Sequence, residues 1–419
     1  MTDLAPYRLT RDRRYVLWLA SDTASGLSNA LSGFAIPLIA LASTGDPAQA
    51  GIVGAVAFAA RLIATVAGGV LADRRRRIPL MRAGAVIGLS LAAAFTALAA
   101  SGSLTFSALL AISTALAVRT GLFGVAGESA LKELVPDEAM GRAQAANQGR
   151  DAALSLLGSP LGGMLLAAGG WFVGAAMTAC QVVAAATAWA LGRGGSDAGE
   201  PPAAAPSRSP FADIREGMGW LLARRDLRGV LVVSTIVNLG FNAGLTTALY
   251  AMQQDGATTT TLGWTMAAAS AAMLAGAVAS PALVARVRAG TLIVVGLLLA
   301  GLGIIALPFV HEPLAIAGVL AAAVVAIPAL NAALLGYFTV ATPSRLLGRA
   351  NSALQVLSMG AMPLAPLVAG FGLAFAGRTG TLALASGLCV AAALVAMADR
   401  NLRSLPAEAG WAAHAAAMR

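Results

Sequence analysis

Charged residues are scarce in this chain. Only 11% of its 419 residues are Asp, Glu, Lys or Arg, whereas 58% are hydrophobic. Soluble globular proteins carry about 25% charged residues. The composition therefore excludes an ordinary soluble domain and predicts an integral membrane protein.

Cysteine and histidine are scarcer still, with two of each. Cys180 and Cys389 lie inside apolar runs, so a disulfide framework is excluded, and no metal-ligand spacing is present. The sequence also lacks a nucleophile–base arrangement and a phosphate-binding loop of the form G-x-x-x-x-G-K-(S/T). We therefore expect neither an enzyme nor an ATP-driven pump, and neither a metal nor a cofactor.

Long apolar segments fill most of the chain. A membrane-spanning helix needs about 20 mostly apolar residues. Twelve segments meet this requirement: 15–41, 48–72, 81–101, 104–130, 144–168, 171–192, 229–252, 262–285, 290–310, 313–340, 350–376 and 379–399. The first is longer than the apolar core of roughly 7–15 residues in a cleaved signal peptide, so we expect it to remain as a span. The sequence predicts an all-α membrane protein with twelve spans.

A polar stretch at 193–228 divides six spans from six. It begins with "SDAGEPPAAAPSRSP", which is typical of a flexible linker. The following "FADIREGMGWLLARRDL" predicts an amphipathic helix at the membrane surface. The predicted organisation is an N-terminal six-helix bundle (1–192), this linker, a C-terminal six-helix bundle (229–402) and a cytoplasmic tail (403–419).

Basic residues lie almost entirely on one side of the predicted spans. Of the 28 Lys and Arg residues, only Arg378 falls in a connection on the opposite side, and only Arg61 and Arg119 lie deep within spans. This positive-inside pattern places both termini in the cytoplasm, and it explains the net charge of +9 without a nucleic-acid partner. The Ala-, Gly- and Arg-rich composition with a single lysine, Lys132, is typical of a GC-rich bacterial genome, so we expect the bacterial inner membrane.

Two cytoplasmic loops resemble one another. The segments "VPDEAMGRAQAANQ" (135–148) and "TPSRLLGRANSALQ" (342–355) share five residues, each pair separated by 207 positions, as Pro136 and Pro343 are. The other pairs are Gly141 with Gly348, Arg142 with Arg349, Ala143 with Ala350, and Gln148 with Gln355. Because both halves begin in the cytoplasm, the sequence predicts two parallel six-helix repeats.

This architecture resembles the major facilitator superfamily of secondary transporters over nearly the whole chain. The family pattern between the second and third spans is Gly-x-Leu-Ala-Asp-Arg-x-Gly-Arg-(Arg/Lys). The sequence supplies Gly69, Leu71, Ala72, Asp73, Arg74 and Arg77. It departs from the pattern with Arg76 at the second glycine and Ile78 at the last basic position. In the family this loop is a conformational latch.

The latch residues have readable physical roles. Gly69 would let neighbouring helices approach closely. Asp73 and Arg74 would form the latch itself through charge-assisted hydrogen bonds, and Arg77 would pair with Glu128. The alternative is that the arginines of this loop only anchor the membrane topology, which we expect for Arg75 and Arg76.

Two further marks point to export. The fifth span contains "GSPLGG", in which Gly158, Pro160, Gly162 and Gly163 resemble a motif of exporting, proton-antiporting branches, with Ser159 as an extra residue. The alternative for these residues is ordinary helix packing. Arg119 resembles the arginine of Leu-x-x-x-Arg-x-x-Gln-Gly in exporters, although Leu116 is one residue too near and the Gln-Gly pair is missing. The resemblance implies the bacterial drug- and siderophore-exporter branch.

Three ionisable residues lie within spans of the N-terminal half: Asp22, Arg61 and Arg119. At 1.5 Å per helical residue they lie roughly 12–20 Å from the charged cytoplasmic ends of their spans. Burying such a group in a membrane is costly, so each needs a reason. Asp22 could exchange protons, with Arg119 and Arg61 setting its proton affinity. Alternatively, the three could form a static ion pair that holds spans together.

The C-terminal half offers polar groups in place of charges. The candidates for a substrate cavity are Asn238, Asn242, Thr246, Asn331, Tyr337 and Gln355. Each could instead make a helix–helix hydrogen bond. Together with the net positive charge of the three membrane residues, these groups suit a hydrophobic small molecule that is neutral or anionic.

The sequence thus predicts a monomeric, proton-coupled exporter of a drug, an antibiotic or a siderophore-like metabolite, with protons and the lipid bilayer as its other partners. An importer or facilitator of a small metabolite is the alternative within transport. A membrane receptor that transports nothing is the alternative outside it, and the buried charges count against it.

Overall fold

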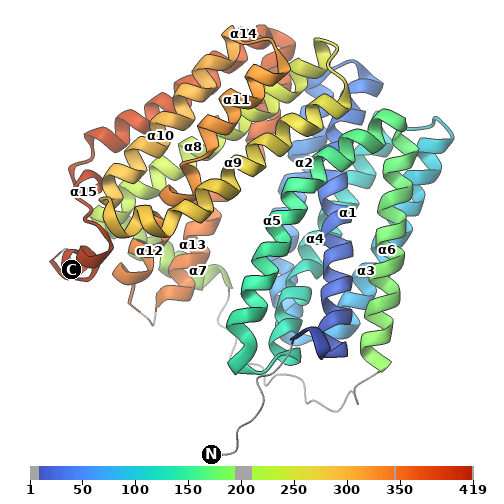
Figure 1. Ribbon diagram of the computed structural model, residues 1–419, viewed down its shortest axis with the longest axis horizontal. Helices are drawn as coiled ribbons and strands as arrows, with labels where there is room; N and C mark the ends of the chain where they lie inside the picture. The colour runs from blue at the N-terminus through green and yellow to red at the C-terminus, as the bar shows by residue number, and fades with distance from the viewer. Residues whose placement is uncertain (1–8, 194–209, 344–345, 418–419) are drawn as a thin grey trace, which may run out of the picture. The chain divides into compact units, whose positions relative to one another are not determined.

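The computed structural model describes residues 9–193, 210–343 and 346–417, and these are almost entirely helical (Figure 1). Eleven helical segments are long and apolar enough to span a membrane by length and composition. The longest, Val356–Ala398, contains two spans, because Gly377 has a φ of 66° and interrupts α14 (Leu364–Ala398). Twelve spans are therefore present in the described part of the chain, and the all-α fold is confirmed.

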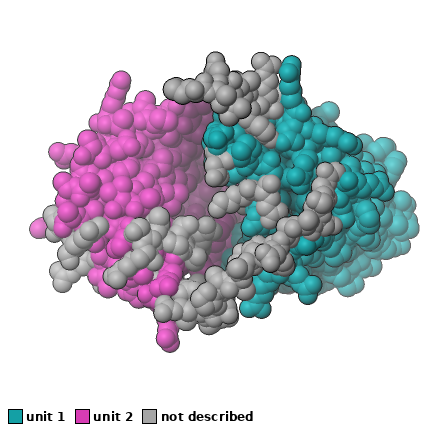
Figure 2. Space-filling model, turned by 90° about the horizontal axis from the view of Figure 1, so that it is seen from below, with its two compact units in different colours: residues 1–45, 56–205 teal, residues 46–55, 206–419 magenta. Residues whose placement is uncertain are grey.

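The chain forms two compact units, coloured separately in Figure 2. Unit 1 comprises residues 1–45 and 56–205, and unit 2 comprises residues 46–55 and 206–419. The helices of the first half are α1 (Arg13–Thr44), α2 (Pro47–Arg74), α3 (Arg77–Ala100), α4 (Phe106–Leu134), α5 (Asp137–Ala168) and α6 (Gly170–Arg193), preceded by the short 3-10 helix η1 (Leu9–Arg11). The first turns of α2 belong to unit 2 and its remainder belongs to unit 1.

Local sequence sets the ends of these helices. The carboxylate of Asp12 accepts hydrogen bonds from the backbone N–H groups of Arg14 and Tyr15, which starts α1. The helix ends at Gly45, whose φ of 67° favours glycine. Between helices, small residues permit close packing. A Cβ on Gly174 of α6, for example, would lie 2.6 Å from Oγ1 of Thr96 in α3.

Unit 2 contains more broken helices. They are α7 (Pro210–Ala223), α8 (Arg225–Gln254), α9 (Thr259–Arg286), α10 (Ala289–Ala306), η2 (Leu307–Phe309), α11 (Pro313–Val324), α12 (Ile327–Ala341), α13 (Leu347–Gly360), α14, α15 (Arg400–Arg403), η4 (Glu408–Gly410) and α16 (Trp411–Ala417). The predicted tenth span at 313–340 is two helices, α11 and α12, with Pro328 in the first turn of the second. Proline cannot donate an intrahelical hydrogen bond, which favours a break there.

The predicted amphipathic linker helix is present as α7. Its Leu221 is buried in the hydrophobic core of unit 2. Its Glu216 forms an ion pair with Arg349 of α13, in which Oε2 lies 2.7 Å from Nη1. The apolar side of α7 thus packs against protein within unit 2. The first part of the predicted linker, at 194–209, lies outside the described residues.

The segment predicted as a tail also packs against unit 2. The indole N–H of Trp411 donates a 3.0 Å hydrogen bond to the carbonyl oxygen of Pro406. The backbone N–H groups of Ala289 and Gly290 in α10 donate to the carbonyl oxygens of Pro406 and Leu405. The described part of this segment is therefore a structural component of unit 2.

The two segments of the sequence repeat lie at the starts of α5 and α13. Ala143 in α5 and Ala350 in α13 are both completely buried. Pro136 directly precedes α5, whereas Pro343 precedes Leu347, the first residue of α13, by four residues, so the two prolines differ in position. The surroundings of Gly348 and of the Gln355 side chain lie outside the described part of the chain.

Candidate functional site

A cavity of about 390 Å³ lies inside unit 1. Its walls come from α1, α2, α3, α4 and α5, and all three charges predicted within the membrane, Asp22, Arg61 and Arg119, line it. Ligand pockets for small molecules occupy about 300–1,000 Å³. The structure thus brings the three predicted residues to one space of a size that suits a small ligand.

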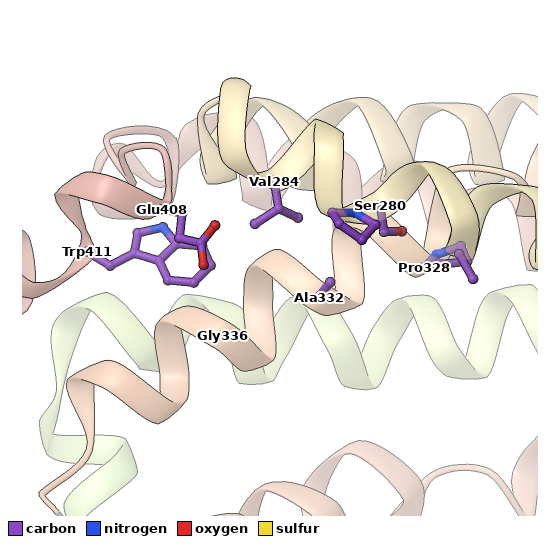
Figure 3. A pocket seen from close by; sticks show the side chains of 9 residues that line it. Ser280, Val284, Pro328, Ala332, Gly336, Glu408 and Trp411 are labelled. Carbon is purple, nitrogen blue, oxygen red and sulfur yellow. The ribbon is translucent and has the colours of Figure 1, made fainter. Parts of the chain in front are cut away.

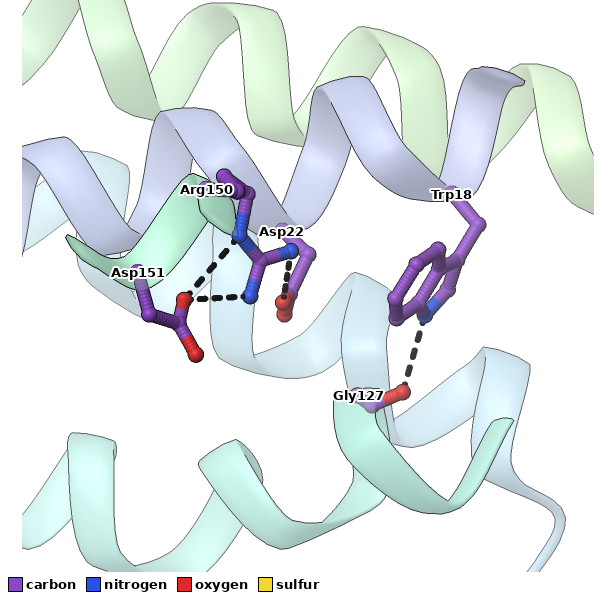
Figure 4. Close-up of polar contacts among 5 residues, drawn as sticks. All are labelled: Trp18, Asp22, Gly127, Arg150 and Asp151. Carbon is purple, nitrogen blue, oxygen red and sulfur yellow. Dashed lines mark hydrogen bonds and ion pairs between the residues drawn. The ribbon is translucent and has the colours of Figure 1, made fainter. Parts of the chain in front are cut away.

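The sequence predicted an interaction between Asp22 and Arg119, but Asp22 pairs with a different arginine. Its Oδ2 lies 2.7 Å from Nη1 of Arg150 in α5 (Figure 4). Arg150 also contacts the exposed carboxylate of Asp151, with Nη2 and Nε at 2.8 Å and 3.1 Å from Oδ1. The side chains of Asp22 and Arg150 are 21% and 13% exposed, so the pair is shielded but not sealed from solvent. Arg150 is therefore a central residue of the site that the sequence analysis missed.

Two residues hold this ion pair in place. The guanidinium of Arg150 lies 5.8 Å from the ring centroid of the buried Trp18, within range of a cation–π contact. The indole N–H of Trp18 donates a 2.8 Å hydrogen bond to the carbonyl oxygen of Gly127 in α4 (Figure 4). A Cβ on Gly127 would lie only 2.8 Å from Oδ1 of Asp22. Glycine at this position leaves room for the carboxylate between α1 and α4.

Arg119 lies in a separate polar cluster of the same cavity and is only 6% exposed. Its Nη2 donates a 2.7 Å hydrogen bond to Oδ1 of Asn29, and its Nη1 donates a 3.3 Å hydrogen bond to the carbonyl oxygen of Gly84. The hydroxyl of Thr120 also donates to Oδ1 of Asn29, at 3.2 Å. Among the described residues, Arg119 contacts neutral acceptors and no carboxylate.

Arg61 differs from the other two charges because its side chain is exposed. It lies on α2 and lines the cavity. No ion pair joins it to Asp22 or to another carboxylate of the described chain. The structure thus does not show the predicted static pairing of Asp22 with the two arginines.

Three of the six residues predicted for a cavity in the C-terminal half, Asn238, Asn242 and Tyr337, have contacts within unit 2. Asn238 donates a 3.4 Å hydrogen bond to the carbonyl oxygen of Ser358, and Asn242 donates a 2.8 Å hydrogen bond to that of Asn238. Tyr337 is only 1% exposed and belongs to the hydrophobic core of unit 2, where it packs among apolar residues. Its ring packs near His414, because the C-terminal segment folds back on α12.

The remaining three candidates have different surroundings. Asn331 is exposed on α12, and Thr246 is half-buried on α8. The side chain of Gln355 lies outside the described part of the chain. Neither Asn331 nor Thr246 lines the cavity of unit 1.

The predicted latch loop is partly described. The side chains of Asp73 and Glu128 lie outside the described part, and Arg74 is exposed at the end of α2. Arg77 donates a 2.6 Å hydrogen bond to the carbonyl oxygen of Ser129, the residue after Glu128. This contact joins α3 to α4, and the predicted pairing of Arg77 with Glu128 lies outside the described part of the chain.

The close helix approach predicted at Gly69 occurs one residue earlier. A Cβ on Gly68 would overlap the carbonyl oxygen of Gly121 and lie 2.7 Å from that of Leu122. A Cβ on Gly69 would meet nothing within 4 Å. Because successive helical residues point about 100° apart, only one of two adjacent glycines can face α4, and it is Gly68.

The glycine–proline motif of the fifth span packs α5 against α1. A Cβ on Gly158 would lie 2.7 Å from Cβ of Ala30, and one on Gly162 would lie 3.0 Å from Cδ1 of Phe34. Pro160 lies inside α5, and Gly163 is buried beside it. This close packing aligns α1 with α5, the two helices that carry Asp22 and Arg150.

A second cavity, of about 500 Å³, lies in unit 2 between α9, α12 and the C-terminal segment (Figure 3). Its walls are mainly apolar, and Glu408 is the charged residue among those that line it. Trp411 closes one end beside Gly336, where a Cβ would lie 2.5 Å from the indole ring. Among the described residues, no group of three His, Cys, Asp or Glu side chains could hold a metal ion.

The residues that sequence reasoning missed did leave a signal. Asn29 follows Asp22 by seven residues, which places both on one face of a helix. Arg150 lies within the predicted fifth span, but only six residues from its start, so it was counted among the basic residues of the cytoplasmic face. Its depth becomes clear only because α5 begins at Asp137 and leans on α1.

Twelve apolar helices with charged side chains around an internal cavity define a multi-pass membrane transporter fold. A family model, the Major Facilitator Superfamily, matches residues 20–362. The chain therefore belongs to the major facilitator superfamily.

Solved transporter structures share the fold at low sequence identity. A bacterial homologue of the iron transporter ferroportin in an inward-facing state is 14% identical, with a TM-score of 0.70 over 93% of this chain and 99% of that one. The nucleoside transporter NupG (D323A mutant) is 12% identical, with a TM-score of 0.70 over 92% and 100%. A bacterial homologue of the human lysosomal transporter Spinster is 17% identical, with a TM-score of 0.64 over 97% and 96%. No curated protein sequence matches the chain significantly.

Proposed function

We propose that the chain is a proton-coupled exporter that moves a hydrophobic neutral or anionic small molecule across the bacterial inner membrane by alternating access. The observation that carries this proposal is the Asp22–Arg150 ion pair on the wall of the 390 Å³ cavity. A carboxylate that is buried within a membrane span and can be reached from a cavity is a candidate proton site.

Protonation of Asp22 would change a contact between two helices. The neutral carboxyl group loses its attraction for Arg150, whose second partner, Asp151, lies on the same helix. Asp151 of α5 would then be the remaining carboxylate partner of the guanidinium, and the ion pair between α1 and α5 would be lost. Proton binding would thereby favour one arrangement of these helices over another, which is the requirement for coupling.

The orientation proposed from the sequence also fits the one basic residue on the opposite side. Arg378 contacts Asp255 at 2.8 Å and donates hydrogen bonds to the carbonyl oxygens of Leu307 and Val310. Its charge is therefore compensated locally, and it does not oppose the positive-inside rule. We propose that both termini are cytoplasmic and that the chain works as a monomer.

Export is favoured over import by the resemblance of the fifth-span motif to that of exporters. Its glycines provide the close α1–α5 packing on which the ion pair depends. Import or facilitated diffusion remains the second candidate, and the direction of accumulation separates the two.

The experiment uses inverted membrane vesicles with an acidic interior and a defined library of amphiphilic acids, bases and neutral compounds. Wild-type vesicles should accumulate a subset of compounds only while the pH gradient lasts, and Asp22→Asn should abolish this accumulation. Asp255→Asn is the matched control, because Asp255 lies outside the cavity. Equilibration of a compound across the vesicle membrane without a pH gradient, and no accumulation with one, would favour a facilitator. Undiminished accumulation by Asp22→Asn would refute the proton site.

A further inference from the structure

Arg119 is a buried positive charge without a counter-ion in the described part of the chain. It is 6% exposed and lines the cavity of unit 1, yet its contacts are with Asn29, Gly84 and Thr120, all neutral. Its Nε–H is buried and has no hydrogen-bond partner. A buried charge and a buried donor are both costly when left uncompensated, so this arrangement calls for an external acceptor.

The carboxylates that line the same cavity do not supply that acceptor. Asp22 and Asp151 are both engaged by Arg150. Asp22, Asp151 and Arg150 together carry one net negative charge. Arg61 and Arg119 together carry two positive charges. The cavity therefore has a surplus of positive charge, and the more buried part of that surplus is at Arg119.

Resting on the proposed function, we infer that Arg119 is the docking site for an oxyanion group, a carboxylate or a phosphate, on an amphiphilic substrate. The guanidinium carries a positive charge and, at Nε–H, a donor without a partner, and together these suit one oxygen of an oxyanion. Gly84, Asn29 and Thr120 accept from the Nη atoms and fix the plane of the guanidinium, and Nε–H remains available for the substrate. The apolar body of the substrate would lie against Phe123, Met81 and Val125, which line the same cavity.

The position of the guanidinium is fixed by the backbone of α3. A Cβ on Gly88 would lie 2.8 Å from Nη1 of Arg119 and 2.6 Å from Oε1 of Gln181. Gln181 is completely buried, and both polar atoms of its amide lack a partner in the structure. Gly88 therefore leaves the space into which the head group of Arg119 fits, and Gly88→Ala should displace that group without changing any charge.

The test measures binding to the purified full-length protein in lipid nanodiscs at neutral pH, by calorimetry and without a pH gradient. The probes share a naphthyl body and differ in the head group: 2-naphthoate, 2-naphthyl phosphate, 2-naphthylmethanol and 2-naphthylmethylammonium. We expect at least one of the two anions to bind about tenfold or more tightly than the alcohol and the cation, as one charge-assisted contact allows. The stronger of the two anions identifies the head group as carboxylate or phosphate.

Variants then assign the preference to Arg119. Arg119→Gln and Gly88→Ala should both remove the preference for anions, and Arg119→Lys should keep part of it. Arg75→Gln, in the exposed loop directly after α2, removes a positive charge outside the cavity and should keep all of the preference. The comparison of head groups on the wild-type protein needs no variant, so a variant that fails to fold does not weaken the test.

Three results would overturn this inference: equal binding of all four probes, no binding of either anion to the wild-type protein, or an unchanged anion preference in Arg119→Gln. The outcome is separate from proton coupling, because binding needs no gradient and Asp22→Asn should still bind the anions. If the anion preference is absent while Asp22→Asn abolishes accumulation, the docking site fails and the proton site stands.

Discussion

At the scale of single residues, the site depends on which arginine meets Asp22. Three charges within spans can be recognised from the sequence, and all three line one cavity. Their partners cannot be recognised in this way, because residues on different helices meet only according to how those helices lean and rotate. Arg150 contacts Asp22, and this leaves Arg119 to neutral partners. Composition and depth alone contain no information on that choice.

Gly127→Ala tests whether the position of the Asp22 carboxylate matters for transport. The new Cβ would lie 2.8 Å from Oδ1 of Asp22 and must displace it from Arg150. Because misplacement of a reacting group by about 1 Å can cost two orders of magnitude, we expect gradient-driven accumulation to fall on the order of tenfold. Gly149→Ala, beside Arg150 but with open space around it, should leave accumulation unchanged. Equal effects of the two variants would contradict this role of Gly127.

A double-mutant cycle tests the ion pair itself. Arg150→Gln leaves Asp22 charged and unpaired within the membrane, so it should lower the melting temperature in nanodiscs. Adding Asp22→Asn removes that unpaired charge and should restore part of the loss. We expect an interaction energy of about 0.5–3 kcal/mol, the range for residues in direct contact. Additive effects of the two substitutions would show that the pair contributes nothing to stability.

At the scale of helices, two adjacent glycines in α2 show that the residue matching the family pattern is not the one that packs against the neighbouring helix. Gly68 faces the backbone of α4, whereas Gly69, the residue that matches the family pattern, has open space around it. Gly68→Ala should therefore destabilise the protein by about 1–3 kcal/mol through overpacking. Gly69→Ala should change stability by no more than about 0.5 kcal/mol. Melting temperatures in nanodiscs measure both, and the reverse order would contradict the assigned rotation of α2.

The C-terminal segment gives a second prediction at this scale. Trp411 is almost completely buried between α12 and the loop before α16, with its indole N–H bonded to Pro406. Replacing a buried Trp by Ala costs about 3–5 kcal/mol, so Trp411→Ala should lower the melting temperature markedly. Ala413→Ser, on the exposed side of α16, should leave it unchanged. An unaffected Trp411→Ala protein would show that this segment is a dispensable tail.

At the scale of the whole molecule, the fold was predictable and the site only in part. Span number follows from apolar length, and the repeat follows from five identities at one offset, because both are properties of the linear sequence. The broken spans in unit 2 and the burial of Tyr337 were not foreseen, since the tail that covers Tyr337 packs through long-range contacts. The helix pairs that build the site also depend on rotation about each axis, as Gly68 and Gly69 illustrate.

The central claim is that Asp22 couples proton movement to transport, and a comparison of two transport modes tests it most directly. Proteoliposomes containing wild-type protein or Asp22→Asn are assayed for pH-driven accumulation and for exchange of a library compound across the membrane at equal pH. The account predicts that Asp22→Asn loses accumulation while retaining exchange, because the substrate site remains and only the proton site is removed. Accumulation by Asp22→Asn at the wild-type level, or loss of exchange and accumulation together in a folded protein, would contradict the account.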